Sequence, residues 1–223
     1  MPRGGLIVLE GAEGVGKTTQ LRRLGERLGR AGIAHRTLRE PGGTAMGDEI
    51  RRVLLDPSMT IAPRAEALLF MASRAQLVDG VVRPALAAGE FVVLDRFFLS
   101  TYAYQVHGRG LSEHEVSSVN AFATAGVRPD LTLLLDLPEG VGLARAAERG
   151  GHDRIEQSGD DFYARVTSAF RRFATAEWQH RHPEAGEVAL IDAQGSEDEV
   201  AARIWTRLSS RWPETFRGKS ESQ

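Results

Sequence analysis

The sequence predicts a doubly wound α/β fold, and two patterns support that prediction. Short apolar runs alternate with longer helical patterns along the whole chain, which is the order of elements found when helices cover both faces of a parallel sheet. Four of the apolar runs, LIVL, FVVL, LTLLLDL and VALI, are apolar at consecutive positions instead of alternating ones. Such runs are typical of strands buried on both faces.

The expected elements follow in chain order. We expect strands over residues 5–10, 34–39, 90–95, 130–137 and 187–191. We expect helices near residues 17–30, 46–55, 64–88, 112–124, 138–149, 160–181 and 197–211. No linker or repeat divides the chain, so residues 1–212 are predicted to form a single domain and 213–223 a flexible tail. Ligands of such sheets bind beyond the carboxyl ends of the strands.

The composition is that of an ordinary globular protein. Of 223 residues, 42% are hydrophobic and 26% are charged, which is enough to bury a core in one domain. The net charge of −2 gives no electrostatic support for nucleic-acid binding, and the absence of cysteine excludes disulfides and thiolate chemistry. The apolar run before Glu10 is too short for a signal peptide or membrane anchor. We therefore expect a cytoplasmic protein without membrane or nucleic-acid partners.

A glycine-rich loop follows the first expected strand. Residues 11–18, GAEGVGKT, satisfy the pattern G-x-x-x-x-G-K-[ST], and the helix that the pattern requires follows directly, with Leu21, Leu24 and Leu28 on one face. Backbone N–H groups of such a loop bind phosphate oxygens, its lysine reaches the β- and γ-phosphates, and its threonine coordinates Mg²⁺. The alternative is a glycine-rich turn without function. The residues predicted to bind ATP are Gly11, Ala12, Glu13, Gly14, Val15, Gly16, Lys17, Thr18 and Thr19.

The loop alone does not identify the acceptor of the phosphoryl group, because GTPases, ATPase motors and small-molecule kinases share it. A GTPase would also carry the base-reading motif N-K-x-D. That motif is absent, since the only lysines are Lys17 and Lys219. The chain length leaves little room for the further domains of a motor. A small-molecule kinase is therefore the favoured class.

Charged and aromatic side chains gather where the later strands are expected to end. Arg39 leaves the second strand, Asp95 and Arg96 end the third, and helical spacing places Phe70 and Arg74 on one face. An aromatic ring can stack on a base, and arginines can bind a base carbonyl and pair with phosphate. The group predicts a second pocket, for a nucleoside monophosphate. Its other members are Glu13, Glu40, Arg51, Ser100, Thr101, Tyr104 and Gln105.

Several of these side chains have a simpler explanation when taken alone. Phe70 on an apolar helix is suited to the core. Arg51 and Arg74 could be solvated helix charges, and Glu13 and Gln105 could be surface residues. The Asp95–Arg96 pair is harder to explain in this way, because it directly follows a buried strand where the Mg²⁺ that bridges the β- and γ-phosphates would bind.

Longer matching stretches are spread over nearly the whole chain. They are LIVLEGAEGVGKTTQ, REPGGT with GDEIR, RAEALLFMASRAQLV, VVLDRFFLSTYAYQ with GRGL, RPDLTLLLDLPEGVGLAR, RGGHDRIE and LIDA. In their order and spacing these stretches resemble the bacterial thymidylate kinase family, for which REPGGT and DR-x-x-x-S-x-x-AYQ are specific. The resemblance implies a P-loop NTPase fold, with five parallel strands, helices on both faces and a small lid. It also implies transfer of the ATP γ-phosphoryl group to dTMP, a Mg²⁺ requirement and a homodimer.

The resemblance implies roles for individual residues as well. Phe70 resembles the residue that stacks on thymine, and Arg74 the residue that binds its O4 atom. Arg96 resembles the arginine that bridges the acceptor phosphate and the γ-phosphate. Asp95 matches a carboxylate near Mg²⁺, and Glu13 matches the acid that approaches the dTMP 3′-hydroxyl. Further positions that match the dTMP pocket are Arg39, Arg51, Thr101, Tyr104 and Gln105.

Residues 145–157 resemble the family's lid over ATP. Some members carry a catalytic arginine inside the glycine-rich loop, and others supply it from the lid. The loop interior here, Ala-Glu-Gly-Val, has no arginine, whereas the lid carries Arg149 and Arg154. We therefore hypothesise that a lid arginine, with Arg154 preferred over Arg149, stabilises charge during transfer. The alternative is a lid arginine engaged in a surface ion pair.

The chain departs from the family pattern at two places. Phe97 stands where a tyrosine usually follows the DR pair, so a hydroxyl contact is lost, and Val106-His107 replaces a glycine-rich stretch after AYQ. Neither departure removes a named role. The family also suggests, and X–Pro chemistry permits, a cis bond between Glu40 and Pro41.

The sequence prediction is therefore an ATP- and Mg²⁺-dependent kinase for dTMP. Its predicted catalytic residues are Lys17, Asp95 and Arg96 with the lid arginines, and Thr18 and Asp95 are its predicted metal ligands. Two rivals stay open. One is a kinase for another nucleoside monophosphate or for a deoxynucleoside, and the other is a nucleotide-binding regulator without turnover.

Overall fold

Five parallel strands form the central sheet of the computed structural model, which describes residues 4–138, 140–149 and 153–216. The strands are β1 (Leu6–Glu10), β2 (His35–Arg39), β3 (Phe91–Asp95), β4 (Leu131–Asp136) and β5 (Val188–Asp192). Their order across the sheet is β2-β3-β1-β4-β5, and all neighbouring pairs are parallel. The predicted strands are confirmed to within one residue at each end.

Helices connect the strands and cover the sheet. They are α1 (Lys17–Arg30), α2 (Ala45–Leu55), α3 (Pro63–Leu77), η1 (Val78–Val82), α4 (Arg83–Ala87), α5 (Phe98–Thr101), η2 (Tyr102–Gly108), α6 (Glu113–Thr124), α7 (Val141–Arg149), η3 (Glu156–Ser158), α8 (Asp160–Phe173), α9 (Ala176–Arg181), η4 (Pro183–Ala185), α10 (Glu197–Arg211) and α11 (Pro213–Phe216). Local sequence determines several starts. The Thr44 hydroxyl accepts from the Gly47 N–H at α2, and Ser196 forms a capping box with Glu199 at α10.

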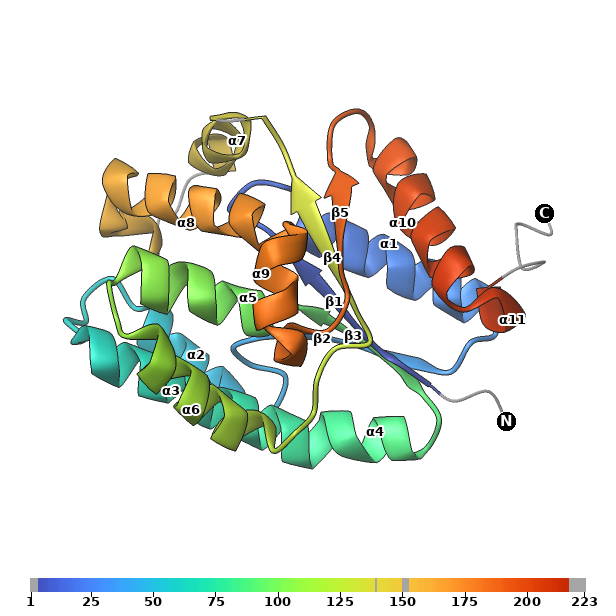
Figure 1. The fold of residues 1–223 in the computed structure, drawn as a ribbon, viewed down its shortest axis with the longest axis horizontal. Coiled ribbons are helices and arrows are strands. Elements are labelled where there is room, and N and C mark those ends of the chain that lie inside the picture. The colour runs from blue at the N-terminus through green and yellow to red at the C-terminus, as the bar shows by residue number, and fades with distance from the viewer. Residues whose placement is uncertain (1–3, 139, 150–152, 217–223) are drawn as a thin grey trace.

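The two faces of the sheet carry separate cores, because successive side chains of a strand point to opposite faces. In β1, Leu6 and Val8 belong to one core, and Ile7 and Leu9 belong to the other. The first core lies under α3, α5, η2 and α8, and the second lies under α1 and α10. Figure 1 shows α1 and α10 on one side of the strands and α3 and α8 on the other. The doubly wound fold is confirmed.

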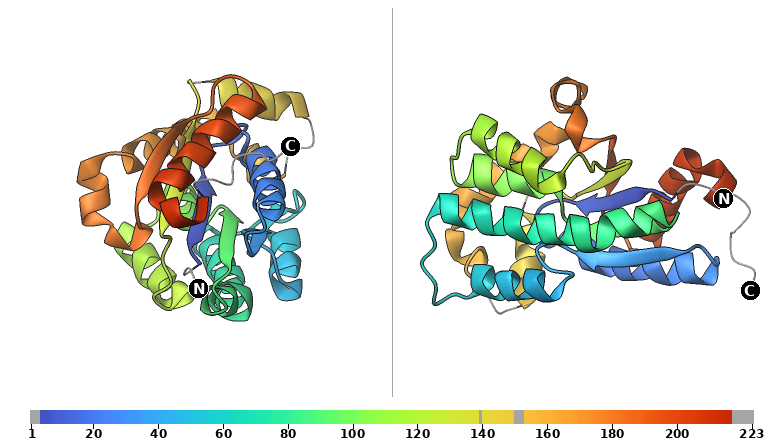
Figure 2. Two further views of the ribbon diagram at one scale, coloured as in Figure 1. Left: turned by 90° about the vertical axis from the view of Figure 1, so that its right-hand side faces the viewer. Right: turned by 90° about the horizontal axis from the view of Figure 1, so that it is seen from below.

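Three helical regions differ from the prediction. Residues 98–108, for which no helix was predicted, form α5 and then the seven-residue π-helix η2. The predicted helix 160–181 is interrupted before α9, which begins where the Thr175 hydroxyl accepts from the Trp178 N–H. The predicted helix 64–88 is one continuous rod, but its middle turn η1 is a π-helix between α3 and α4 (Figure 2). Such π-turns commonly lie near functional sites.

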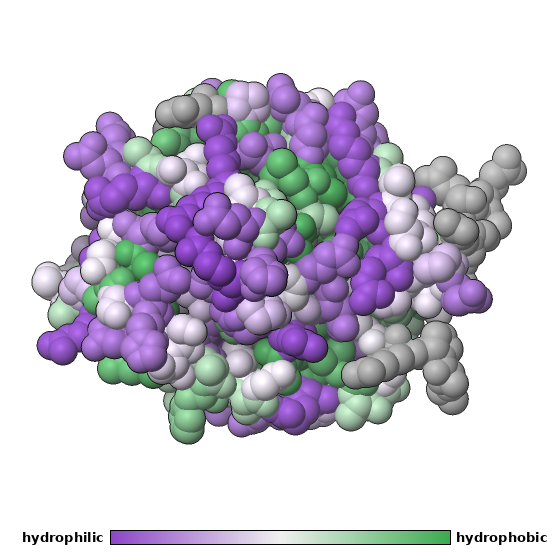
Figure 3. Space-filling model, viewed as in Figure 1, coloured by the Kyte–Doolittle hydropathy of each residue, from purple (hydrophilic) through white to green (hydrophobic). Residues whose placement is uncertain are grey.

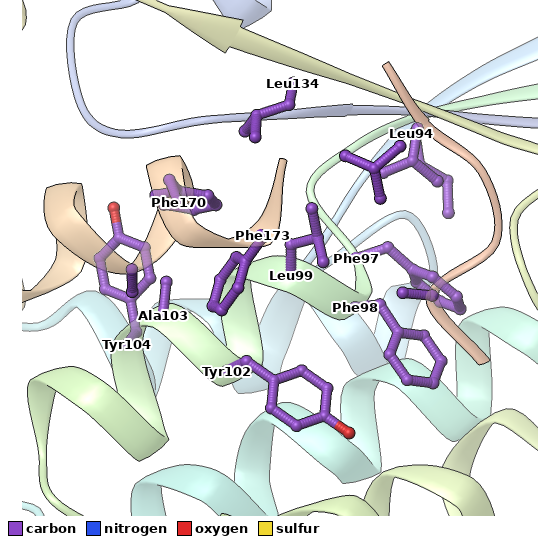
Figure 4. Packing of buried hydrophobic residues seen from close by; sticks show 14 of the residues in the cluster. Leu94, Phe97, Phe98, Leu99, Tyr102, Ala103, Tyr104, Leu134, Phe170 and Phe173 are labelled. Atoms are coloured by element: carbon purple, nitrogen blue, oxygen red, sulfur yellow. The ribbon is translucent and has the colours of Figure 1, made fainter. Parts of the chain in front are cut away.

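Buried aromatic side chains explain why residues 98–108 are helical. Phe97, Phe98, Tyr102 and Phe173 pack together under these turns (Figure 4), with ring centroids 5.6 Å apart for Phe97–Phe98 and 6.4 Å apart for Tyr102–Phe173. Their burial outweighs the modest helix propensity of aromatic and β-branched residues, which is why local sequence did not predict the helix. The packing fixes α5 and η2 against α8.

The folded part of the domain extends beyond the predicted boundary at residue 212. Pro213–Phe216 form α11, and the buried Phe216 ring packs against Phe91, Trp205 and Trp212. The expectation of a flexible tail from Pro213 is therefore corrected for these four residues. The polar composition of residues 213–223 led to the prediction of a tail. The aromatic contacts of Phe216 instead close the end of the second core.

The molecular surface is largely hydrophilic in the view of Figure 3, with a small hydrophobic area over the edge strand β5, where Leu190 is exposed. Large apolar side chains are also exposed on helices, among them Leu68 on α3 and Phe122 on α6. Within the described ranges, no helix combines the length and the apolar character needed to cross a membrane.

Candidate active site

A cleft of about 700 Å³ opens at the carboxyl ends of the strands, where the fold class predicts a ligand site. It has two halves. The donor half is lined by loop residues Glu13, Gly14, Val15, Gly16, Lys17, Thr18 and Thr19. The acceptor half contains every residue predicted for the acceptor pocket, namely Glu13, Arg39, Glu40, Arg51, Phe70, Arg74, Arg96, Ser100, Thr101, Tyr104 and Gln105.

The glycine-rich loop joins β1 to α1 through backbone conformations that favour glycine. Gly14 and Gly16 have φ values of 73° and 92°, in the left-handed region that other residues seldom adopt. A Cβ atom on Gly14 would also lie 1.8 Å from the carbonyl oxygen of Gly142. The loop therefore requires glycine here, and α1 begins at Lys17 with its N-terminus directed toward the cleft.

Lys17 is a buried cation held by the loop that contains it. Its Nζ donates to the carbonyl oxygens of Gly11 at 3.0 Å and Ala12 at 2.7 Å. Burial, together with the nearby charge of Arg96, lowers the pKa of Lys17 to about 8. Phosphate oxygens in the donor half would stabilise the protonated form. The ammonium is thus placed where a polyphosphate would compensate for its lost hydration.

Thr18 and Asp95 meet across the donor half. The Thr18 hydroxyl donates to Oδ2 of Asp95 at 3.0 Å. The other oxygen, Oδ1, is buried and has no hydrogen-bond partner among the described residues, which calls for an explanation in a folded protein. A hydroxyl and a carboxylate are hard oxygen ligands of the kind that Mg²⁺ binds. These two residues therefore fit a Mg²⁺ ion.

Arg96 lies between the two halves. Its φ of 72° is uncommon for a residue with a side chain and is typical of functional sites. The guanidinium pairs with Glu13 at 2.5 Å and donates to the Ser100 hydroxyl at 3.0 Å. The Tyr104 hydroxyl donates to the same Glu13 oxygen at 2.9 Å, and burial raises the pKa of Tyr104, so the hydroxyl keeps its proton. Arg96, Glu13 and Tyr104 thus form one polar cluster.

Glu10 supports this cluster, although the sequence interpretation gave it no role. It ends β1 fully buried, and its carboxylate accepts from the backbone N–H groups of Phe97 and Ser100 and from the Ser100 hydroxyl at 2.6 Å. These groups begin α5, so Glu10 acts as a carboxylate cap for that helix and fixes the turn at Arg96. The only sequence signal was a charged residue at the end of an apolar strand.

Arg74 is buried deep in the acceptor half, and its guanidinium donates hydrogen bonds to four oxygen atoms. Its Nε donates to Glu40 at 2.7 Å, its Nη1 donates to the Thr101 hydroxyl and to Asn120, and its Nη2 donates to the Phe97 carbonyl oxygen. Burial raises the pKa of Glu40, and the charge of Arg74 opposes that rise. The alternative of a solvated helix charge is therefore wrong for Arg74. Asn120, on α6, was missed because it is distant in sequence.

The outer part of the acceptor half carries two more arginines and an aromatic ring. Arg51 donates to the Pro41 carbonyl oxygen at 3.1 Å, and burial with the charge of Arg39 lowers its pKa. Arg39 lies 3.5 Å from Asp48 and is largely exposed. The Phe70 ring is half-buried and lines the cleft. The Glu40–Pro41 bond is cis, as the family resemblance suggested.

The lid arginines differ from the sequence hypothesis in position. The Arg154 guanidinium is nearly buried against Glu66 and the Leu54 carbonyl oxygen and is not part of the cleft lining. The side chain of Arg149 lies outside the described part of the structure. Arg145, to which the sequence interpretation assigned no role, does line the cleft. Helical spacing on α7 was a signal that could have identified it.

The comparisons with known proteins agree with this geometry. The family model for thymidylate kinase matches residues 9–204. A thymidylate kinase of Deinococcus radiodurans is 49% identical over 211 residues, covering 95% of this chain and 99% of the relative. One from a Synechococcus strain is 49% identical over 215 residues (96% and 98%), and one from Carboxydothermus hydrogenoformans is 48% identical over 172 residues (77% and 85%). The chain belongs to the thymidylate kinase family.

Proposed function

We propose that this chain performs the reaction of its family, the transfer of the γ-phosphoryl group of ATP to dTMP. The products are dTDP and ADP, and the step supplies a precursor for DNA synthesis. One observation carries the proposal. A single cleft is lined by a phosphate-binding loop with Lys17, by Phe70 and Arg74 of the acceptor half, and by Arg96.

In the donor half, Lys17 and the loop N–H groups bind the β- and γ-phosphates of ATP. The Thr18 hydroxyl and Asp95, whose buried Oδ1 lacks a partner among the described residues, would hold a Mg²⁺ ion. When bound, the ion would neutralise negative charge on the phosphates. Since transfer depends mainly on positioning and charge compensation, no strong general base is needed.

In the acceptor half, Phe70 stacks on thymine and Arg74 faces the base carbonyl. The Thr101 hydroxyl that accepts from Arg74 also lines the cleft, so a base carbonyl can share or replace that contact. Glu13 accepts a hydrogen bond from the 3′-hydroxyl of dTMP. Arg96 contacts both the dTMP phosphate and the γ-phosphate. Charged groups therefore converge where the new P–O bond forms.

A lid arginine completes the charge compensation in our proposal. Arg149 keeps this role, because Arg154 faces Glu66 and not the cleft. Arg145 lines the cleft and adds positive charge on the ATP side. We propose that residues 145–157 form the lid over ATP, as in the family that the chain resembles.

We further propose a cytoplasmic homodimer. Phe122 on α6 is 86% exposed and Leu68 on the neighbouring α3 is 56% exposed. Large contiguous apolar patches mark protein interfaces, and we propose that these two side chains belong to such a patch. A Phe122→Glu variant should elute as a monomer in size-exclusion chromatography with light scattering. A monomeric wild-type chain at the same concentration would contradict the proposal.

The activity is tested by coupled assay with ATP and a panel of dTMP, dUMP, dCMP, dGMP, UMP and thymidine. We expect dTMP to be the preferred acceptor, with dUMP as a weaker one. Preferred turnover of any other member would favour a kinase for that compound. Binding of ATP without turnover on the panel would favour a nucleotide-binding regulator.

A further inference from the structure

The carboxylate of Glu66 has no role in the reaction described above, yet four donors bind it. Glu66 lies on α3 and is 1% exposed. Arg109 donates to both carboxylate oxygens at 3.1 Å, Arg154 donates to Oε2 at 2.7 Å, and Gln105 donates to Oε1 at 3.1 Å. A carboxylate accepts about four hydrogen bonds. Its capacity is therefore filled.

These donors come from separate parts of the chain. Gln105 belongs to η2, Arg109 follows η2, and Arg154 belongs to residues 153–156, which precede α8. Burial would raise the pKa of Glu66, but the hydrogen bonds from Arg109 and Arg154 outweigh it and hold the pKa below its ordinary value. Glu66 is thus an ionised centre that joins three segments inside the protein.

Arg154 is tied to the neighbouring helix as well. Its Nε donates to the Leu54 carbonyl oxygen at 2.8 Å. Its backbone N–H donates to the carbonyl oxygen of Leu55 at 3.1 Å. Both carbonyls belong to the last turn of α2, where such groups have no partner inside the helix. The adjacent residues Asp153 and Ile155 line the cleft. Arg154 therefore faces away from the cleft and holds its neighbours in the cleft wall.

The contact with Gln105 fixes a residue of the acceptor half. An ionised carboxylate only accepts hydrogen bonds, so Gln105 must direct its NH₂ group toward Glu66. Its carbonyl oxygen is then left for other partners. Gln105 is buried and lines the cleft. One carboxylate thereby determines the position of two walls of the same cleft.

We propose that Glu66 is a positioning residue, which couples residues 153–156 to the acceptor half of the cleft through Arg154 and Gln105. The inference rests on the function proposed above. It assigns Arg154 a positioning role, in place of the direct role hypothesised from sequence. Loss of Glu66 leaves the nearly buried Arg154 and the Gln105 amide without their shared acceptor, so both cleft walls lose that support. Loss of Arg154 leaves Glu66 paired with Arg109 but frees residues 153–156 from this carboxylate.

A double-mutant cycle in the full chain tests the coupling. The variants are Arg154→Gln, Glu66→Gln and the pair, with kcat and the KM values for dTMP and ATP measured separately. We expect each single change to raise the KM for dTMP about tenfold with a smaller effect on the KM for ATP, and the pair to cost no more than the worse single change. Additive effects would overturn the coupling. So would a loss of kcat from Arg154→Gln, at unchanged KM for dTMP, in both backgrounds.

A second readout does not depend on turnover. Hydrogen exchange of the amides in residues 153–158, without nucleotide, should become at least about tenfold faster in Arg154→Gln. This variant also decides the test if Glu66→Gln does not fold, because the Arg154 side chain keeps 10% exposure and is the milder change. Unchanged exchange in a folded Arg154→Gln protein would overturn the proposal.

The chain offers a matched control on α2. Arg52 and Glu49 form an ion pair in which both side chains are 70% exposed, and such pairs contribute little. Arg52→Gln should change neither the KM for dTMP nor the exchange of residues 153–158. If the wild-type chain shows no dTMP turnover, the proposed function fails, whereas the exchange comparison still reports on the coupling between Glu66 and Arg154.

Discussion

The two halves of the cleft are built in different ways. In the donor half, one contiguous loop supplies most contacts, and its own carbonyl groups hold Lys17. In the acceptor half, side chains from β2, α2, α3, α5 and η2 converge. Buried carboxylates hold them in place, as Glu40 holds Arg74 and Glu66 holds Gln105. The donor half is therefore a local structure, whereas the acceptor half depends on long-range contacts with buried carboxylates.

The largest effect is expected when the donor half alone is damaged. Lys17→Met should lower kcat about 10³-fold, because a positioned cation on the transferring phosphoryl group is lost. Binding of dTMP, measured by isothermal titration calorimetry, should change little, since the hydrogen bonds of Lys17 to described residues go to carbonyl oxygens of its own loop. If dTMP binding disappeared together with turnover, the separation of the two halves would be wrong.

The next effect is expected in the acceptor half. Arg74→Met leaves Glu40 buried without its partner, and breaking a buried ion pair from one side costs about 3 kcal/mol or more. We expect a lower free energy of unfolding in urea denaturation and a raised KM for dTMP. The affinity for ATP should be nearly unchanged.

A second substitution tests whether the uncompensated charge of Glu40 causes the expected loss of stability. Glu40→Gln added to Arg74→Met removes the uncompensated carboxylate, so it should restore part of the free energy of unfolding without restoring dTMP binding. A double variant no more stable than Arg74→Met would show that the buried charge is not the cause of the loss.

The same contrast explains what could be predicted from the sequence. The five strands, most helices and the whole phosphate loop were predictable, because consecutive residues determine them. The cleft lining was predictable from the family motifs, but the residues that support it were not. Glu10 and Asn120 act on residues more than 40 positions away, and no local pattern marks such partners. Arg154 was misplaced for the same reason, since its partner Glu66 lies 88 positions away.

A smaller effect tests the acceptor half without disturbing its ion pairs. Phe70→Leu keeps an apolar side chain in the cleft but removes the ring, and stacking of a base on an aromatic ring contributes about 1 kcal/mol or more. The KM for dTMP should rise about tenfold, while kcat and the KM for ATP stay close to wild type. An unchanged KM for dTMP would show that Phe70 does not stack on the base and only packs in the core.

The smallest effect concerns a single proton on Lys17. Its pKa in the nucleotide-free protein is about 8, against 10.5 for an ordinary lysine. The unfolded chain therefore binds this proton more tightly than the folded chain does, so the contribution of Lys17 to stability rises with pH between about 8 and 10.5. The phosphates of ATP act in the opposite direction, because they favour the charged ammonium.

Binding of ATP at about pH 8.5 should consequently take up a fraction of a proton. Calorimetric titrations in buffers of different ionisation enthalpy measure that uptake directly. Binding of dTMP in the acceptor half should take up a much smaller fraction of a proton. It is therefore an internal control for the electrostatic independence of the two halves. Uptake that persists in Lys17→Met would assign the proton to another group. Uptake that is equal for dTMP and ATP would show that Lys17 responds to both halves of the cleft.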